Sequence, residues 1–228
     1  MILLAIETAT EACSAALYQD GAVLERHEVA PREHNRLILP MLESLLAEAG
    51  LALGRVDAVA FGRGPGSFTG VRIAAGVAQG IAFALDLPVA PVSTLAALAD
   101  EAIAETGCEY AFPCIDARMA EVYFAVYRRD AEGCPELLGQ ERVLAPGRVD
   151  FSSAAGAGAG TGSGWATYRS CLSGLAGGRL DSVLSGRFPR AAAVARLGAR
   201  IHARGDSVPP EQALPVYLRD DVAKKPKP

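Results

Sequence analysis

The stretch VDAVAFGRGPGSFTGVRIAAGVAQGIAFAL, residues 56–85, decides how this chain folds. Its first six residues are an apolar run, the next eight form a loop with three glycines, and the remainder is compatible with a helix. We therefore predict a strand, a glycine-rich loop and a helix in that order. Such a loop can hold an anion such as phosphate on its backbone N–H groups and on the positive end of the helix. Alternatively, it is only a tight connection between strand and helix.

The loop has some features of a phosphate site and lacks others. Its glycines let the backbone lie close to a ligand, and its hydroxyl residues can cap the helix that follows. It has neither the Gly-Lys-Ser/Thr ending of a P-loop nor the pattern G-x-G-x-x-G. The polar turn after the first strand is a second place where open α/β sheets bind ligands. The candidate nucleotide or phosphate site is therefore Glu7, Thr8, Gly64, Gly66, Ser67 and Thr69, and a turn without a ligand is the alternative.

The helix after the loop is apolar on more than one side. No charged residue lies between Arg72 and Asp86, and Gly76, Gly80 and Ala84 recur every four residues. Small residues at this spacing let another backbone approach closely. One apolar face of this helix packs on a sheet, so the other apolar face must be covered by a second helix. That cover is the chain's own helix predicted for residues 34–49, a helix of another chain, or both.

The rest of the chain predicts two α/β halves. The first has strands at 1–6, 13–18, 23–29, 56–61 and 88–92 and helices at 34–49, 70–85 and 94–105. Asp20-Gly21 is a hairpin turn, Ser93 caps the third helix, and Pro40 kinks the first helix or sets its first turn apart. We predict an N-terminal lobe of residues 1–106 and a smaller C-terminal lobe of residues 107–228.

The C-terminal lobe repeats a similar plan. Its predicted strands are 110–115, 122–128 and 137–144, its last helix runs from Pro189 to about residue 204, and an extended piece covers 214–218. The glycine tract at 154–164 is either a flexible linker or a short strand and turn before a helix at 165–175. The basic residues at 224–228 are predicted to be a mobile tail.

Composition narrows the class of protein. Half of the 228 residues are hydrophobic, and the formal net charge of -4 argues against autonomous nucleic-acid binding. Five cysteines without a C-x-x-C pair suggest neither a disulfide framework nor a zinc site, and they favour the cytoplasm. The apolar N-terminus has no basic leader and is interrupted by Glu7 after six residues, which is not typical of a signal peptide. The apolar run 73–85 is shorter than the ~20 residues of a membrane span. We expect no signal peptide and no membrane segment.

Four motifs together resemble one family. They are Ile6-Glu7-Thr8-Ala9-Thr10, residues 64–72, Ile115-Asp116-Ala117-Arg118 followed by Glu121-Val122-Tyr123, and residues 215–219. With these motifs the chain resembles the TsaB family, also called YeaZ, over most of its length. The resemblance implies an α/β fold with two lobes of the actin, sugar-kinase and Hsp70 type (the ASKHA fold), in which mixed sheets are flanked by helices. It also implies a role in making N6-threonylcarbamoyladenosine in tRNA, at the adenosine adjacent to the anticodon of ANN-decoding tRNAs.

TsaB is similar to a larger paralogue, TsaD, which performs the transfer. In TsaD the segment matching residues 92–98 carries two metal-binding histidines, whereas this chain has Thr94 and Leu98, which cannot share a metal. The resemblance therefore implies a non-catalytic partner without catalytic residues, metal ligands or a cofactor of its own, although ATP or ADP with Mg can bind in the complex. It implies TsaD and the ATPase subunit TsaE as partners, a homodimer when the chain is alone, and tRNA contact only through the complex.

Two other classes of function compete with this one. A phosphotransferase of the sugar-kinase type needs a catalytic aspartate, for which Asp116 is the candidate, and a second phosphate loop, for which residues 156–164 are the candidate. A peptidase has no support, because the sequence contains neither H-E-x-x-H nor G-x-S-x-G.

The family's partner contact resembles a bundle formed by the first two helices of each protein. Carried over to this sequence, the interface consists of Leu37, Ile38, Met41, Leu42 and Leu45 of the first helix and Val71, Ala74, Val77, Ala78 and Ile81 of the second. On this prediction, either Leu42→Glu or Val77→Glu abolishes partner binding without unfolding the chain.

Overall fold

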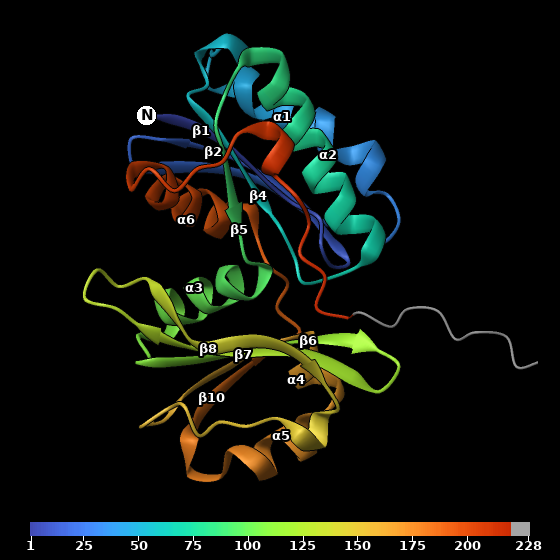
Figure 1. Ribbon diagram of the computed structural model, residues 1–228, viewed down its shortest axis with the longest axis vertical. Helices are drawn as coiled ribbons and strands as arrows, with labels where there is room; N and C mark the ends of the chain where they lie inside the picture. The colour runs from blue at the N-terminus through green and yellow to red at the C-terminus, as the bar shows by residue number, and fades with distance from the viewer. Residues whose placement is uncertain (220–228) are drawn as a thin grey trace, which may run out of the picture.

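Residues 1–219, which the computed structural model describes, form two five-stranded mixed sheets with helices on both faces of each (Figure 1). The first sheet contains β1 (Ile2–Glu7), β2 (Ala12–Gln19), β3 (Ala22–Val29), β4 (Ala58–Gly62) and β5 (Val89–Val92) in the order β3-β2-β1-β4-β5. The second contains β6 (Tyr110–Arg118), β7 (Glu121–Arg129), β8 (Pro135–Leu144), β9 (Gly158–Gly162) and β10 (Leu180–Ser185) in the order β10-β9-β6-β7-β8. The helices are α1 (His34–Glu48), α2 (Phe68–Leu85), α3 (Thr94–Thr106), α4 (Ser163–Thr167), α5 (Arg169–Ala176) and α6 (Ala191–Ala203).

The first sheet is built around β1, which pairs antiparallel with β2 and parallel with β4. Because β1 has a neighbour on each side and helices above and below, nearly all of its side chains are buried, as its apolar sequence predicts. The β2–β3 hairpin turns at Asp20-Gly21, where both residues have positive φ. β4 begins at Ala58, two residues later than predicted, because a short 3₁₀ turn (Leu53–Arg55) precedes it and the Asp57 carboxylate accepts the Ile2 N–H.

Layers of helices and sheets follow one another from top to bottom of the molecule (Figure 1). α1 and α2 cover one face of the first sheet and α6 covers the other. α3 lies on the second sheet, whose far face carries α4 and α5. The predicted division into residues 1–106 and 107–228 therefore does not match how the helices pack. α3, from the first range, packs on the second sheet, and α6, from the second range, packs on the first.

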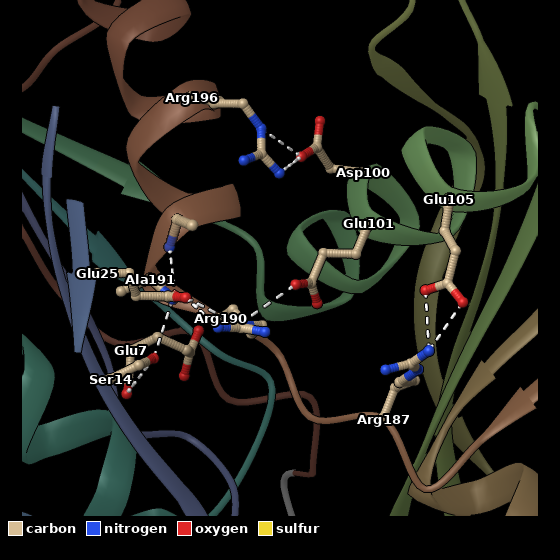
Figure 2. A network of polar contacts seen from close by, with 11 residues as sticks. Glu7, Ser14, Glu25, Asp100, Glu101, Glu105, Arg187, Arg190, Ala191 and Arg196 are labelled. Carbon is tan, nitrogen blue, oxygen red and sulfur yellow. Dashed lines mark hydrogen bonds and ion pairs between the residues drawn. The ribbon is translucent and has the colours of Figure 1, made fainter. Parts of the chain in front are cut away.

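The two lobes meet where α3 faces α6. Around this contact Arg196 binds Asp100, Arg190 lies 3.8 Å from Glu101, and Arg187 binds Glu105 (Figure 2). The arginines come from α6 and the segment before it, and the acids come from α3. This row of ion pairs joins the lobes on one side of the molecule.

The glycine tract is part of the second sheet, so the linker alternative is wrong. β9 is buried along its whole length, and a Cβ at Gly160 would lie 2.5 Å from the Trp165 ring. The glycines are thus explained by a large ring packed against a strand. The helix predicted at 165–175 is two helices, α4 and α5, and β10 was not predicted.

Three smaller predictions change. α1 continues without interruption through Pro40, so its first turn is not set apart. β6 and β7 extend further than predicted, and the turn between them has Arg118, Met119 and Ala120 at positive φ. α6 begins at Ala191, two residues after Pro189. The basic residues 224–228 lie outside the described residues.

α2 is the helix of residues 1–219 that is long and apolar enough, by length and composition, to cross a membrane. Its mean hydropathy is 1.4 over 18 residues. It also forms the crossover between the parallel strands β4 and β5, and its Val71, Ala74, Ala78 and Ala82 are buried on the first sheet. Part of its apolar surface is therefore explained by the core.

Candidate functional site

The glycine loop lies directly against the turn between β1 and β2. The Ser67 N–H donates to the Ala9 carbonyl at 2.7 Å, and the Thr8 hydroxyl donates to the Gly70 carbonyl at 2.7 Å. A Cβ at Gly66 would lie 2.4 Å from the Ala9 carbonyl oxygen. Glycine is required here by the approach of the chain's own backbone, which occupies the space beside Gly66.

The two hydroxyl residues of the loop have different surroundings. Ser67 caps α2, because its Oγ accepts the Gly70 N–H at 3.4 Å. Thr69 is exposed and lines a groove between α1 and α2. A second, larger cavity lies between the two lobes. Of the six residues predicted to bind a nucleotide or phosphate, only Gly66 and Ser67 line it.

Glu7 is fully buried beneath the loop. Its carboxylate accepts the Ala9 N–H at 2.6 Å and the Thr94 hydroxyl at 3.3 Å. Burial raises the pKa of Glu7 to about 7, although the bonds from Ala9 and Thr94 oppose this shift. Gly62 has no room for a side chain, because a Cβ there would overlap the Glu7 carboxylate. Glu7 thus connects β1, β4 and α3 and does not face the cavity.

The cavity between the lobes has a volume of about 540 Å³. Residues of the β1–β2 turn, the β6–β7 turn and the C-terminal segment line it, and Phe68, Tyr123 and Tyr217 make much of its wall apolar. Two of the three arginines that line it are paired with acids, since Arg118 binds Glu11 at 2.7 Å and Arg219 binds Glu121 at 2.6 Å, and Arg32 is the third. The cavity therefore offers few free charges to a polyphosphate.

A metal site and a second phosphate loop are not formed by residues 1–219. No group of three His, Cys, Asp or Glu side chains in that range is arranged to hold a metal ion. Thr94 binds Glu7, and Leu98 packs in the core beneath α3. Asp116 binds the Arg118 N–H at 2.8 Å, and the tract proposed as a phosphate loop is strand β9. The glycine tract is therefore a buried strand and not a phosphate loop, whereas Asp116 lines the cavity between the lobes.

Six of the ten residues predicted for the partner interface are buried inside this chain, so they cannot line an interface in this fold. Leu42 is 3% exposed and packs between α1 and the sheet. The periodicity identified the apolar face of each helix correctly, but the first sheet covers that face. The buried residues are Ile38, Leu42, Leu45, Val71, Ala74 and Ala78, and the partly exposed ones are Leu37, Met41, Val77 and Ile81.

The outward face of α2 is different and remains uncovered by other elements of residues 1–219. A Cβ at Gly76 or Gly80 would have no neighbour within 4 Å, so α1 does not cover the small residues of α2. Phe83 is 81% exposed, Phe68 is 55% exposed and, on α1, Leu39 is 50% exposed. The four-residue spacing of small residues signalled this face in the sequence, whereas nothing there distinguished Leu39 and Phe83 from core residues.

A groove of about 400 Å³ lies along this face. Phe68, Arg72, Ile73 and Val77 of α2 form one wall, and Asn35 of α1 forms the other. The Arg72 guanidinium lies over the Phe68 ring, 3.3 Å from its centroid. The groove is apolar with a cation at one end.

Two lobes, each a mixed sheet between helices, with a cavity where they meet, define a two-lobed α/β protein. Residues 23–158 match the family model described as TsaD, tRNA N6-adenosine threonylcarbamoyltransferase. The chain belongs to the TsaB (YeaZ) family of tRNA threonylcarbamoyladenosine biosynthesis proteins.

Relatives and solved structures agree over nearly the whole chain. The TsaB protein of Escherichia coli is 43% identical over 99% of this chain and 97% of its own length, and that of Haemophilus influenzae is 38% identical over 99% and 96%. A Pseudomonas aeruginosa structure described as similar to peptidase YEAZ is 49% identical, with a TM-score of 0.89 over 96% of this chain and 99% of its own. YeaZ of Pseudomonas aeruginosa is 47% identical, with a TM-score of 0.87 over 95% and 99%.

Proposed function

We propose that this chain is a non-catalytic subunit that docks on a TsaD-type threonylcarbamoyl transferase and supports formation of N6-threonylcarbamoyladenosine in tRNA. The observation that carries the proposal is the outward face of α2, where Gly76 and Gly80 leave open space beside the exposed ring of Phe83. A helix of a partner can approach this face as closely as two backbones allow.

The size of the exposed apolar groups is consistent with a stable contact. Full burial of one large apolar side chain contributes about 1.5–3 kcal/mol. Phe68, Phe83 and Leu39 are 55%, 81% and 50% exposed, so burial of their remaining surface offers roughly 3–6 kcal/mol before the loss of translational and rotational freedom is subtracted. Arg72 at the end of the groove favours a partner that brings a carboxylate.

A non-catalytic role is supported by the contacts of Thr94 and Leu98. Both residues are engaged inside the fold, and neither offers a nitrogen ligand to a metal. The transfer of the threonylcarbamoyl group is then the work of the partner, which also provides the contact with tRNA.

The remaining partners follow from the same proposal. The ATPase subunit TsaE joins the complex, and ATP or ADP with Mg binds there and not in the closed glycine loop. When the paralogue is absent, two copies of this chain pair through the same face of α2. The complex works in the cytoplasm.

The decisive experiment is reconstitution of tRNA modification. Purified chain and paralogue are mixed with tRNA, ATP, threonine, bicarbonate and the carbamoyl-AMP-forming enzyme, and modified adenosine is measured by mass spectrometry. We expect modification when both proteins are present and its loss when either is omitted. Modification by this chain with the paralogue rigorously absent would refute the non-catalytic role.

A further inference from the structure

The C-terminal segment Leu214–Arg219, here called the strap, crosses from the first lobe to the second beside the interlobe cavity (Figure 1). It follows Ala213, which is buried in the core beneath α1 and α2. The Val216 N–H donates to the Arg63 carbonyl at 2.8 Å, so the middle of the strap is fixed to the start of the glycine loop. The first half of the strap is thus part of the first lobe.

The far end of the strap binds the second lobe. The Arg219 guanidinium donates to the Glu121 carboxylate at 2.6 Å and to the Ala117 carbonyl at 3.0 Å. The two acceptors flank the β6–β7 turn, whose residues 118–120 all have positive φ. Because this backbone conformation is unfavourable for residues other than glycine, the turn depends on such outside contacts.

The middle of the strap reaches the groove on α2. The Tyr217 ring lies 5.8 Å from the Phe68 ring, and the Arg72 guanidinium lies 5.2 Å from the centre of Tyr217. Phe68 lines both the interlobe cavity and the groove between α1 and α2. One aromatic side chain therefore separates the two hollows, and the strap packs on it.

The strap runs to the right of α3 and α6 in Figure 1, and the ion pairs between these two helices are drawn in Figure 2. A rotation of the lobes about the α3–α6 contact changes the width of the cavity on the side of the strap. The bonds of Arg219 and Val216 resist such a rotation, because they attach the strap to both lobes.

We propose that the strap couples the α1–α2 groove to the interlobe cavity, so that contact of a partner with Phe68 and Arg72 fixes the β6–β7 turn and the opening between the lobes. The part of this inference that concerns a partner rests on the proposed docking function, whereas the coupling itself belongs to the free chain.

Hydrogen exchange of the β6–β7 turn tests the coupling in the free chain. Tyr217→Ala removes the contact with Phe68, and Arg219→Gln removes the charged contact with Glu121 at the other end. We expect exchange in the β6–β7 turn to become about tenfold faster in Arg219→Gln, which loses a hydrogen bond to a charged group. In Tyr217→Ala, which loses an aromatic contact, we expect it to become about two- to tenfold faster. Leu214→Ala is the matched control, since this side chain is 59% exposed, and it should exchange like the wild type.

Addition of the purified paralogue tests whether docking at the α1–α2 groove changes the β6–β7 turn. Docking should slow exchange of the turn in the wild type and in Leu214→Ala, but not in Tyr217→Ala at a saturating concentration. Unchanged exchange in free Tyr217→Ala, or equal protection of the turn in this variant and the wild type, overturns the coupling. Absence of paralogue binding to the wild type overturns the docking function, while the free-chain comparison still decides the coupling.

Discussion

Gly80→Gln separates docking from folding more cleanly than any substitution in the apolar core. Gly80 is exposed in the interior of α2, and a side chain there meets nothing within 4 Å. Glutamine is a better helix former than glycine by about 0.5 kcal/mol. We therefore expect the variant to be as stable as the wild type or to melt about 1–2 °C higher.

The same substitution should weaken docking strongly. A glutamine side chain at Gly80 fills the space into which the partner's backbone is expected to move, and overpacking of a close contact costs about 1–3 kcal/mol. The dissociation constant for the paralogue should rise roughly fivefold to 150-fold. Isothermal titration calorimetry measures the affinity and differential scanning calorimetry the stability.

Gly174→Gln is the matched control. Gly174 also lies in a helix, α5, and also has open space around its Cβ position, but it belongs to the second lobe. We expect wild-type affinity for this variant. If Gly80→Gln binds the paralogue as tightly as Gly174→Gln does, the outward face of α2 is not the docking surface.

The other predictions concern burial and charge. Leu42→Glu should unfold the chain in a urea titration, because an unpaired buried carboxylate costs several kcal/mol, whereas Val77→Glu on the partly exposed side should fold and lose paralogue binding on a sizing column. Burial raises the pKa of Glu101 from 4.5 to about 8, with Arg190 opposing, so the folded state holds a proton that the unfolded state releases. The free energy of unfolding of the wild type should therefore fall relative to Glu101→Gln as the pH rises from about 4.5 to 8; a constant difference would contradict the shift. Gly160→Ala should lower the melting temperature by several degrees because of Trp165, and an unchanged value would show that the strand can move away.

Local patterns in the sequence predicted the elements better than they predicted what each element contacts. The spacing of apolar residues identified α1 and α2, but it could not show whether Leu42 and Ala78 face a sheet or a partner. A helical period tells which residues share a face, and only the path of the chain decides what covers that face. For the same reason α6 was placed with the second lobe, although it packs on the first sheet.

The glycine loop illustrates a related limit. The loop glycines indicated that something approaches the backbone closely. This is confirmed at Gly66, and Gly70 of α2 is approached in the same way. The approaching groups are the carbonyls of Ala9 and Thr8, which lie far from the loop in sequence and close to it in the fold. A glycine pattern reports a lack of space, and it does not distinguish a ligand from the chain's own backbone.

The closed glycine loop also helps to explain why we assign docking of the partner to the outward face of α2. The N-terminus of α2 is occupied by its own cap, Ser67, and by the β1–β2 turn, so the helix has little to offer an anion. Its buried stripe is fixed on β4 and β5, which makes the position of the outward stripe rigid. A rigid helix with open glycines is a surface that a second helix can meet without reorganising the fold, and this lowers the entropic penalty of docking. The contacts that close the loop therefore also hold Gly76 and Gly80 in place for a partner.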